Sequence, residues 1–80
     1  MVTLDSLLNV WSFEDRLLAI EYLSIPNKLD CMGRVHSLNV TYGFRVVHQI
    51  MEQLELVRQG LDLSYDEFQR KIKPELEMYN

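Results

Sequence analysis

The chain contains few of the residues that break or crosslink a fold: its 80 residues include 1 Cys, 2 Pro and 3 Gly. A single thiol cannot close an intrachain disulfide, so a disulfide framework is excluded. The hydrophobic content of 48% excludes a disordered or low-complexity chain. No apolar run approaches the roughly 20 residues of a membrane-spanning helix, and the first residues lack the basic region of a signal peptide. The sequence therefore predicts one small domain, residues 1–80, in the cytoplasm.

Alanine is also scarce, because large side chains make up nearly all of the apolar content. The chain has 13 Leu, 7 Val and 8 aromatic residues, whereas Ala19 is the single alanine. Each large apolar side chain left in water forgoes roughly 1.5–3 kcal/mol of burial free energy. A domain of this size buries only about 60% of its unfolded surface. We therefore expect bulky apolar residues on the surface, as at protein interfaces; ordinary scattered exposure is the alternative explanation.

Four segments show the apolar spacing of amphipathic helices, at i, i+3, i+4 and i+7. They cover residues 3–11, 12–24, about 40–60, and 64–79. The links between them are short, which favours antiparallel neighbours. The sequence therefore predicts an all-α fold, a small up-and-down helical bundle of about four helices.

Polar residues mark where three of these helices begin. Thr3 fits an N-cap, whose hydroxyl accepts a hydrogen bond from a free backbone N–H of the first turn. Ser12 with Asp15, and Ser64 with Glu67, have the spacing of capping boxes, in which the two residues satisfy each other's backbone N–H.

Proline and glycine mark the expected helix ends. Pro26 disfavours helical geometry before it, so the second helix is predicted to end near Ser24. Gly60 is expected to end the third helix in the left-handed conformation. Pro74 falls opposite the apolar stripe of the last helix, where it either bends the helix around the core or breaks it at Lys73.

Residues 27–43 fit a helix, a loop or a strand. Apolar and polar residues alternate from Leu38 to Val46, which is typical of a strand. An apolar repeat of seven residues that begins at Val40 instead indicates a helix, and this longer pattern should prevail from Phe44 onward. The structure of residues 27–43 stays open on the sequence alone.

The helix predicted over residues 12–24 has two apolar faces. Phe13, Leu17 and Ile20 form one stripe, which is expected to face the core. Leu18 and Tyr22 point to nearly the opposite side. The second face is then either sandwiched within the bundle or presented to another chain.

Two groups of residues have side chains of the types that catalyse reactions or bind metal ions, and we expect neither group to do so. Cys31 and His36 would form a nucleophile–base pair, but no orienting acid is indicated. His48, Glu52 and Glu55 have metal-ligand spacing on one helix, but they flank its apolar stripe on the outer side. We therefore predict no enzyme, no metal site and no cofactor.

Nucleic-acid binding is the alternative function. Arg45, Gln49 and Gln53 would line a helix face able to read a groove, although Glu52 lies beside them. The net charge of −4 opposes it. The other basic candidates are diluted by nearby acids; they are Arg34, Arg70, Lys71 and Lys73.

The sequence therefore predicts a small non-enzymatic protein that acts through protein–protein interaction, as a regulator, inhibitor or accessory subunit. It is expected to be a homodimer and to bind a further protein, with nucleic acid as the less favoured partner. The predicted interface consists of apolar residues outside the main inward stripes, namely Leu18, Tyr22, Ile25, Tyr42 and Leu56.

Overall fold

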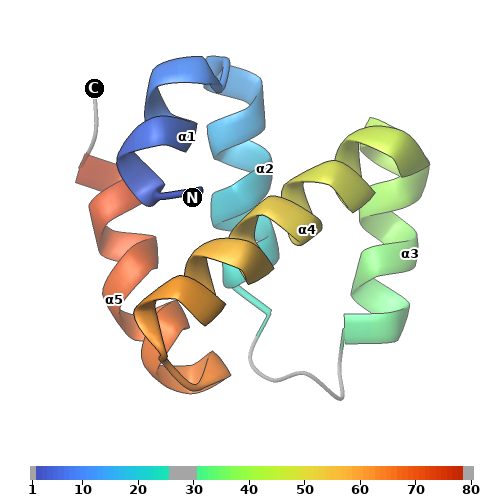
Figure 1. Cartoon of the computed structure of the whole chain (residues 1–80). Coiled ribbons are helices and arrows are strands. Elements are labelled where there is room, and N and C mark those ends of the chain that lie inside the picture. Colours follow the sequence, from blue (N-terminus) through green and yellow to red (C-terminus); the bar gives the residue numbers. More distant parts are fainter. Residues whose placement is uncertain (1, 26–30, 79–80) are drawn as a thin grey trace.

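All regular structure in the described residues is helical. The computed structural model describes residues 2–25 and 31–78, which form α1 (Leu4–Val10), α2 (Phe13–Leu23), α3 (Cys31–Tyr42), α4 (Phe44–Leu61) and α5 (Tyr65–Met78). The long α4 runs obliquely across the molecule, with α3 at one of its ends and α5 near the other (Figure 1). α2 packs against both α4 and α5, and α3 packs against α4. The predicted small all-α helical bundle is confirmed, with a fifth helix, α3, within residues 27–43, which the sequence alone does not assign.

The predicted helix starts are confirmed. The Thr3 side chain accepts a hydrogen bond from the backbone N–H of Ser6 at 3.2 Å. The Ser12 hydroxyl accepts from the Asp15 N–H at 3.2 Å, and the Asp15 carboxylate accepts from the Ser12 N–H in return. Ser64 accepts from the Glu67 N–H at 3.3 Å, as predicted, but the Glu67 carboxylate accepts from the Ser64 hydroxyl at 2.9 Å instead of from its backbone N–H, so the reciprocal half of this capping box differs. These short polar contacts set the starts of α1, α2 and α5.

The end of α4 differs from the prediction. The helix continues through Gly60 to Leu61, and Asp62 adopts the left-handed conformation with φ 54°. Asp is one of the few residues besides Gly that visits this region, because its short polar side chain bonds locally. Arg58 also donates a hydrogen bond to the Leu63 carbonyl at 2.7 Å, which supports the end of the helix. Asp62 therefore takes the role of C-terminal cap that was predicted for Gly60.

The end of α2 agrees with the prediction, and Pro74 does not end α5. α2 ends at Leu23 with Ser24 as its C-cap, as predicted. α5 is continuous through Pro74, which is exposed, so the helix does not break at Lys73. Proline is tolerated here because its missing N–H and its ring lie on the solvent side. Residue 79, included in the predicted helix, lies outside the described ranges.

Gly43 separates two helices where one was predicted to start near residue 40. It has φ 96°, a value that glycine adopts without the penalty of a Cβ atom. Its N–H still donates to the Asn39 carbonyl at 2.9 Å, while its own carbonyl accepts from Val47 at 3.2 Å. α3 thus ends and α4 begins within a single residue, and the alternating pattern from Leu38 to Val46 forms helix ends and no strand.

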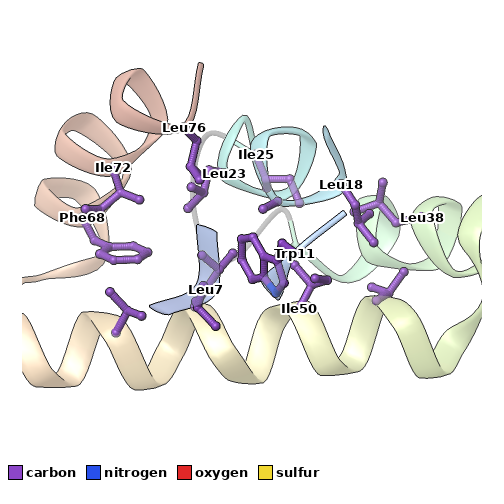
Figure 2. Close-up of a cluster of buried hydrophobic side chains, with 14 residues drawn as sticks. Leu7, Trp11, Leu18, Leu23, Ile25, Leu38, Ile50, Phe68, Ile72 and Leu76 are labelled. Atoms are coloured by element: carbon purple, nitrogen blue, oxygen red, sulfur yellow. The ribbon is translucent and has the colours of Figure 1, made fainter. Parts of the chain in front are cut away.

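Buried apolar side chains from every helix form one core. Side chains from α1, α2, α3 and α5 converge over the face of α4 that carries Ile50 (Figure 2). Phe44, the first residue of α4, does not contribute to this core and is exposed. The core consists of Leu7, Trp11, Leu18, Ala19, Leu23, Ile25, Leu38, Val47, Ile50, Leu54, Val57, Phe68, Ile72 and Leu76.

The faces of α2 differ from the prediction in part: of the three residues predicted to face the core, Ile20 packs against it as predicted, whereas Phe13 and Leu17 do not. Leu18 is only 1% exposed and Tyr22 packs against the core, whereas Phe13 is 63% exposed and Leu17 is also exposed. Leu18 and the buried Ala19 lie on the side of α2 that faces the core. Two helices, α4 and α5, pack against α2. The spacing identifies two apolar faces but does not say which one the other helices cover.

Candidate interaction surface

The structure does not bring the five predicted interface residues together. Leu18 and Ile25 lie in the core of their own chain, so their assignment to a surface was wrong. Tyr22 is half-buried against the same core. Tyr42, at the end of α3, and Leu56, on the outer side of α4, are exposed as the prediction requires. Other residues must therefore be considered for a contact surface.

Three exposed apolar residues, Val10 at the end of α1 and Phe13 and Leu17 on α2, make up what we call the α2 face. Phe13 and Leu17 are one turn apart on the side of α2 away from the core, and Val10 ends the preceding helix. The Arg16 guanidinium lies over the Phe13 ring, 5.7 Å from its centroid, in a cation–π contact. The exposed Glu14 follows Phe13 directly. The α2 face therefore combines apolar area with charges of both signs.

A second exposed cluster, which we call the α3–α4 corner, consists of residues 40–46. Every residue in this run is exposed, although it contains four large apolar side chains. Val40 is 74% exposed and Phe44 is 67% exposed. The Phe44 ring stacks on the His48 ring, with centroids 5.6 Å apart and planes 11° apart. So much apolar area on a short projecting segment is typical of a contact surface.

A hydrogen bond ties the α3–α4 corner to α2. The Tyr42 hydroxyl donates to a carboxylate oxygen of Glu21 at 2.8 Å. This hydrogen bond, and secondly the negative charge of Glu21, raise the pKa of Tyr42 above its ordinary value of 10.0. The bond fixes the Tyr42 side chain and leaves Val40 and Phe44 as the most exposed apolar groups of the corner.

The residues proposed for groove reading do not form a common free face. The Gln53 amide oxygen accepts a hydrogen bond from the indole N–H of Trp11 at 2.7 Å, so it serves the fold. Arg45 and Gln49 are exposed on α4. On α5, Lys73 lies 3.8 Å from the carboxylate of Glu77. The nucleic-acid alternative thus loses one of its three reading residues.

The residues considered for chemistry are also separated. Glu55 pairs with the Arg58 guanidinium, and this hydrogen bond raises the pKa of Arg58. Within residues 2–25 and 31–78, no group of three or more His, Cys, Asp or Glu side chains is arranged to hold a metal ion. The exposed His36 lies on α3, and the side chain of its proposed partner Cys31 lies outside the described ones.

A half-open groove of about 420 Å³ lies among the start of α1, the end of α4 and α5. Its walls are mainly apolar and include Leu4, Leu61 and Ile72. Its charged residues are of both signs, with Lys71 beside acids of α1 and α5. The groove therefore singles out no ligand chemistry, unlike the two exposed clusters.

Comparison of the chain with family models, curated proteins and solved structures finds no match. Among the described helices, none has the length and apolar character required to span a membrane. The function must therefore be inferred from the two exposed clusters themselves.

Proposed function

We propose that this is a small non-enzymatic helical protein of the cytoplasm that acts through protein–protein interaction and forms a homodimer. The observation that supports this function is the division of its apolar residues. The core of the described residues is filled by fourteen buried side chains, yet the α2 face and the α3–α4 corner remain exposed. Covering such side chains on association contributes roughly 1.5–3 kcal/mol for each one fully buried.

The α2 face is the surface that suits a second copy. A two-fold symmetric contact places the same patch of both subunits together, so the patch must be complementary to itself. The α2 face meets this condition, since Phe13 and Leu17 provide apolar area while Glu14 and Arg16 provide opposite charges.

Sedimentation equilibrium of the wild-type protein over a concentration series tests the homodimer. The weight-average mass should rise above the 9.5 kDa of a single chain as the concentration reaches about tens of micromolar. A mass that stays at the single-chain value throughout the series would refute self-association.

A further inference from the structure

Gly43 divides one apolar repeat between two helices. The residues of this repeat recur at intervals of seven, which is the spacing of one side of a continuous helix; they are Val40, Val47, Leu54 and Leu61. Val47 and Leu54 are buried, whereas Val40, on the other side of Gly43, is 74% exposed. The apolar spacing therefore continues through a bend that the backbone makes at one residue with φ 96°.

The bend also leaves the start of α4 without a side-chain cap. Gly43 occupies the N-cap position and makes no side-chain hydrogen bond to the first turn. In a continuous helix, the N–H groups of residues 44–46 would donate to the carbonyls of residues 40–42. If Gly43 took helical φ and ψ, α3 and α4 would thus become one helix over residues 31–61 and gain these hydrogen bonds.

Straightening at Gly43 moves α3 away from its own core. α4 alone is about 27 Å long, which is close to the 28 Å of the longest dimension of the molecule. A continuous helix would carry α3 about 18 Å beyond the start of α4. Leu38, which is now 5% exposed, would then leave the core. The open chain therefore needs another source for the contacts that it gives up.

Two units of the fold lie on either side of Gly43. In the first unit, α3 is tied to α2 by the hydrogen bond from Tyr42 to Glu21, and Ile25 and Leu38 border the same small cavity. This first unit consists of α1, α2 and α3. The second unit consists of α4 and α5, and α2 packs against both of its helices. A second copy contains the same two units and can supply every contact between them.

We propose that Gly43 is the hinge of an exchange between two copies of the chain. In the exchanged dimer, the first unit of each copy packs against the second unit of the other, and α3 continues into α4 as one helix. The Trp11 indole would donate to Gln53 of the other copy, and Gln69 to the end of the other copy's α2. The contacts between units are kept and the hydrogen bonds of the straight helix are added, against the entropy cost of association.

The test is refolding of the full chain from urea at about 1 μM and at about 1 mM, followed by dilution and size-exclusion chromatography. The wild-type protein should form a dimer at the higher concentration. This dimer should persist after dilution, because its two chains separate only when both cores open.

Two substitutions at the hinge should act in opposite directions. Gly43→Ala disfavours the positive φ and favours the straight helix, so it should lower the dissociation constant of the persistent dimer by about tenfold or more. Phe44→Pro should abolish this dimer. Proline suits the first residue of α4 in the bent chain, whereas in the straight helix its ring would clash with the carbonyl of residue 40.

Gly33→Ala is the matched control, because Gly33 lies within α3 in both forms and should leave the dissociation constant unchanged. Circular dichroism confirms that each variant keeps its helices. Three results would overturn the exchange: a persistent dimer of Phe44→Pro equal to that of the wild-type protein, equal effects of Gly43→Ala and Gly33→Ala, and a Gly43→Ala variant that remains a single chain after refolding at about 1 mM.

This inference goes beyond the proposed function and fails separately from it. Single chains kept in native buffer stay bent, because exchange requires the core to open, so their sedimentation equilibrium reports the α2 face alone. The variant with Phe13→Glu and Leu17→Glu should still form the persistent dimer on refolding, since both residues are exposed and away from Gly43. Rapid self-association without a persistent dimer would end the exchange and leave the contact through the α2 face intact.

Discussion

Two glutamine side chains make contacts between helices that the apolar pattern does not indicate. Gln53 of α4 accepts from the indole of Trp11. Gln69 of α5 donates to the Leu23 carbonyl and to the Ile25 carbonyl, the latter at 2.7 Å. The last carbonyls of a helix have no partner within it. Gln69 therefore satisfies the end of α2 from a helix more than forty residues later in the chain.

Gln69→Ala should lower the free energy of unfolding by about 1–3 kcal/mol, because it leaves partly buried carbonyls without their donor. Urea denaturation followed by circular dichroism measures the change. Gln59→Ala is the matched control, since Gln59 is exposed and makes only a long contact, of 3.4 Å, to Glu55. Its effect should stay within about 0.5 kcal/mol. Equal effects of the two substitutions would contradict the bridging role of Gln69.

Tyr42 provides a prediction about pH. Because its pKa in the folded protein is raised above 10.0, the stabilisation from its bond to Glu21 is fully present below pH 10.0. That stabilisation is lost as the pH rises through the raised value, where the hydroxyl ionises beside a carboxylate. Glu21→Gln removes the charge and should move the tyrosinate transition of Tyr42 to lower pH, as measured by ultraviolet absorbance with Tyr42→Phe as the reference. An unchanged transition would show that the two side chains do not interact.

At the scale of helices, local chemistry predicted the starts better than the ends. The caps at Thr3, Ser12 and Ser64 depend on residues within one turn, so the sequence contains all that is needed. The end of α4 depends instead on Asp62 and on Arg58 reaching beyond the helix. Such contacts form only once the following chain is in place, and spacing does not reveal them.

α3 was the least predictable element. Its alternating residues suit a strand, but the described residues offer no strand to pair with, and Gly43 ends the helix. The apolar repeat of seven that crosses Gly43 suggested continuity from Val40 onward. Gly43, with its positive φ, interrupts the helix but leaves the spacing of the apolar residues unchanged. The sequence alone therefore did not distinguish one helix from two.

The two described glycines outside α4 allow a paired test of this break. Gly43→Ala should destabilise the protein by about 1 kcal/mol or more, because φ 96° is strained for any residue with a Cβ. Gly33→Ala should stabilise it by about 0.5–1 kcal/mol, since Gly33 lies within α3 and an added Cβ meets nothing within 4 Å. Thermal unfolding of both variants gives the sign. Stabilisation by Gly43→Ala would show that α3 and α4 are not joined in this way.

At the scale of the molecule, composition predicted exposed bulky residues but not which ones. Leu18 and Leu56 were assigned to one surface because both fall outside the main stripes. One is buried and the other exposed, since α2 is covered by two helices on the Leu18 side while Leu56 lies on the outer side of α4. Which face is covered depends on the packing of the whole chain.

A comparison of Leu18→Glu with Leu56→Glu tests whether Leu18 is buried and Leu56 exposed in the folded protein. Leu18→Glu should unfold the protein, because it places an unpaired charge at a position that is only 1% exposed. Leu56→Glu should change the free energy of unfolding by no more than about 0.5 kcal/mol, as for a surface site. Circular dichroism in a urea series measures both, and a folded Leu18→Glu variant would mean that α2 is turned the other way.

The most direct measurement of the central claim is sedimentation equilibrium of the variant with Phe13→Glu and Leu17→Glu. Both residues are exposed in the single chain, so the variant should keep its helices. If the α2 face is where two copies meet, four added carboxylates would repel one another across the contact. The account predicts a mass of 9.5 kDa at every concentration. Self-association equal to that of the wild-type protein would contradict it.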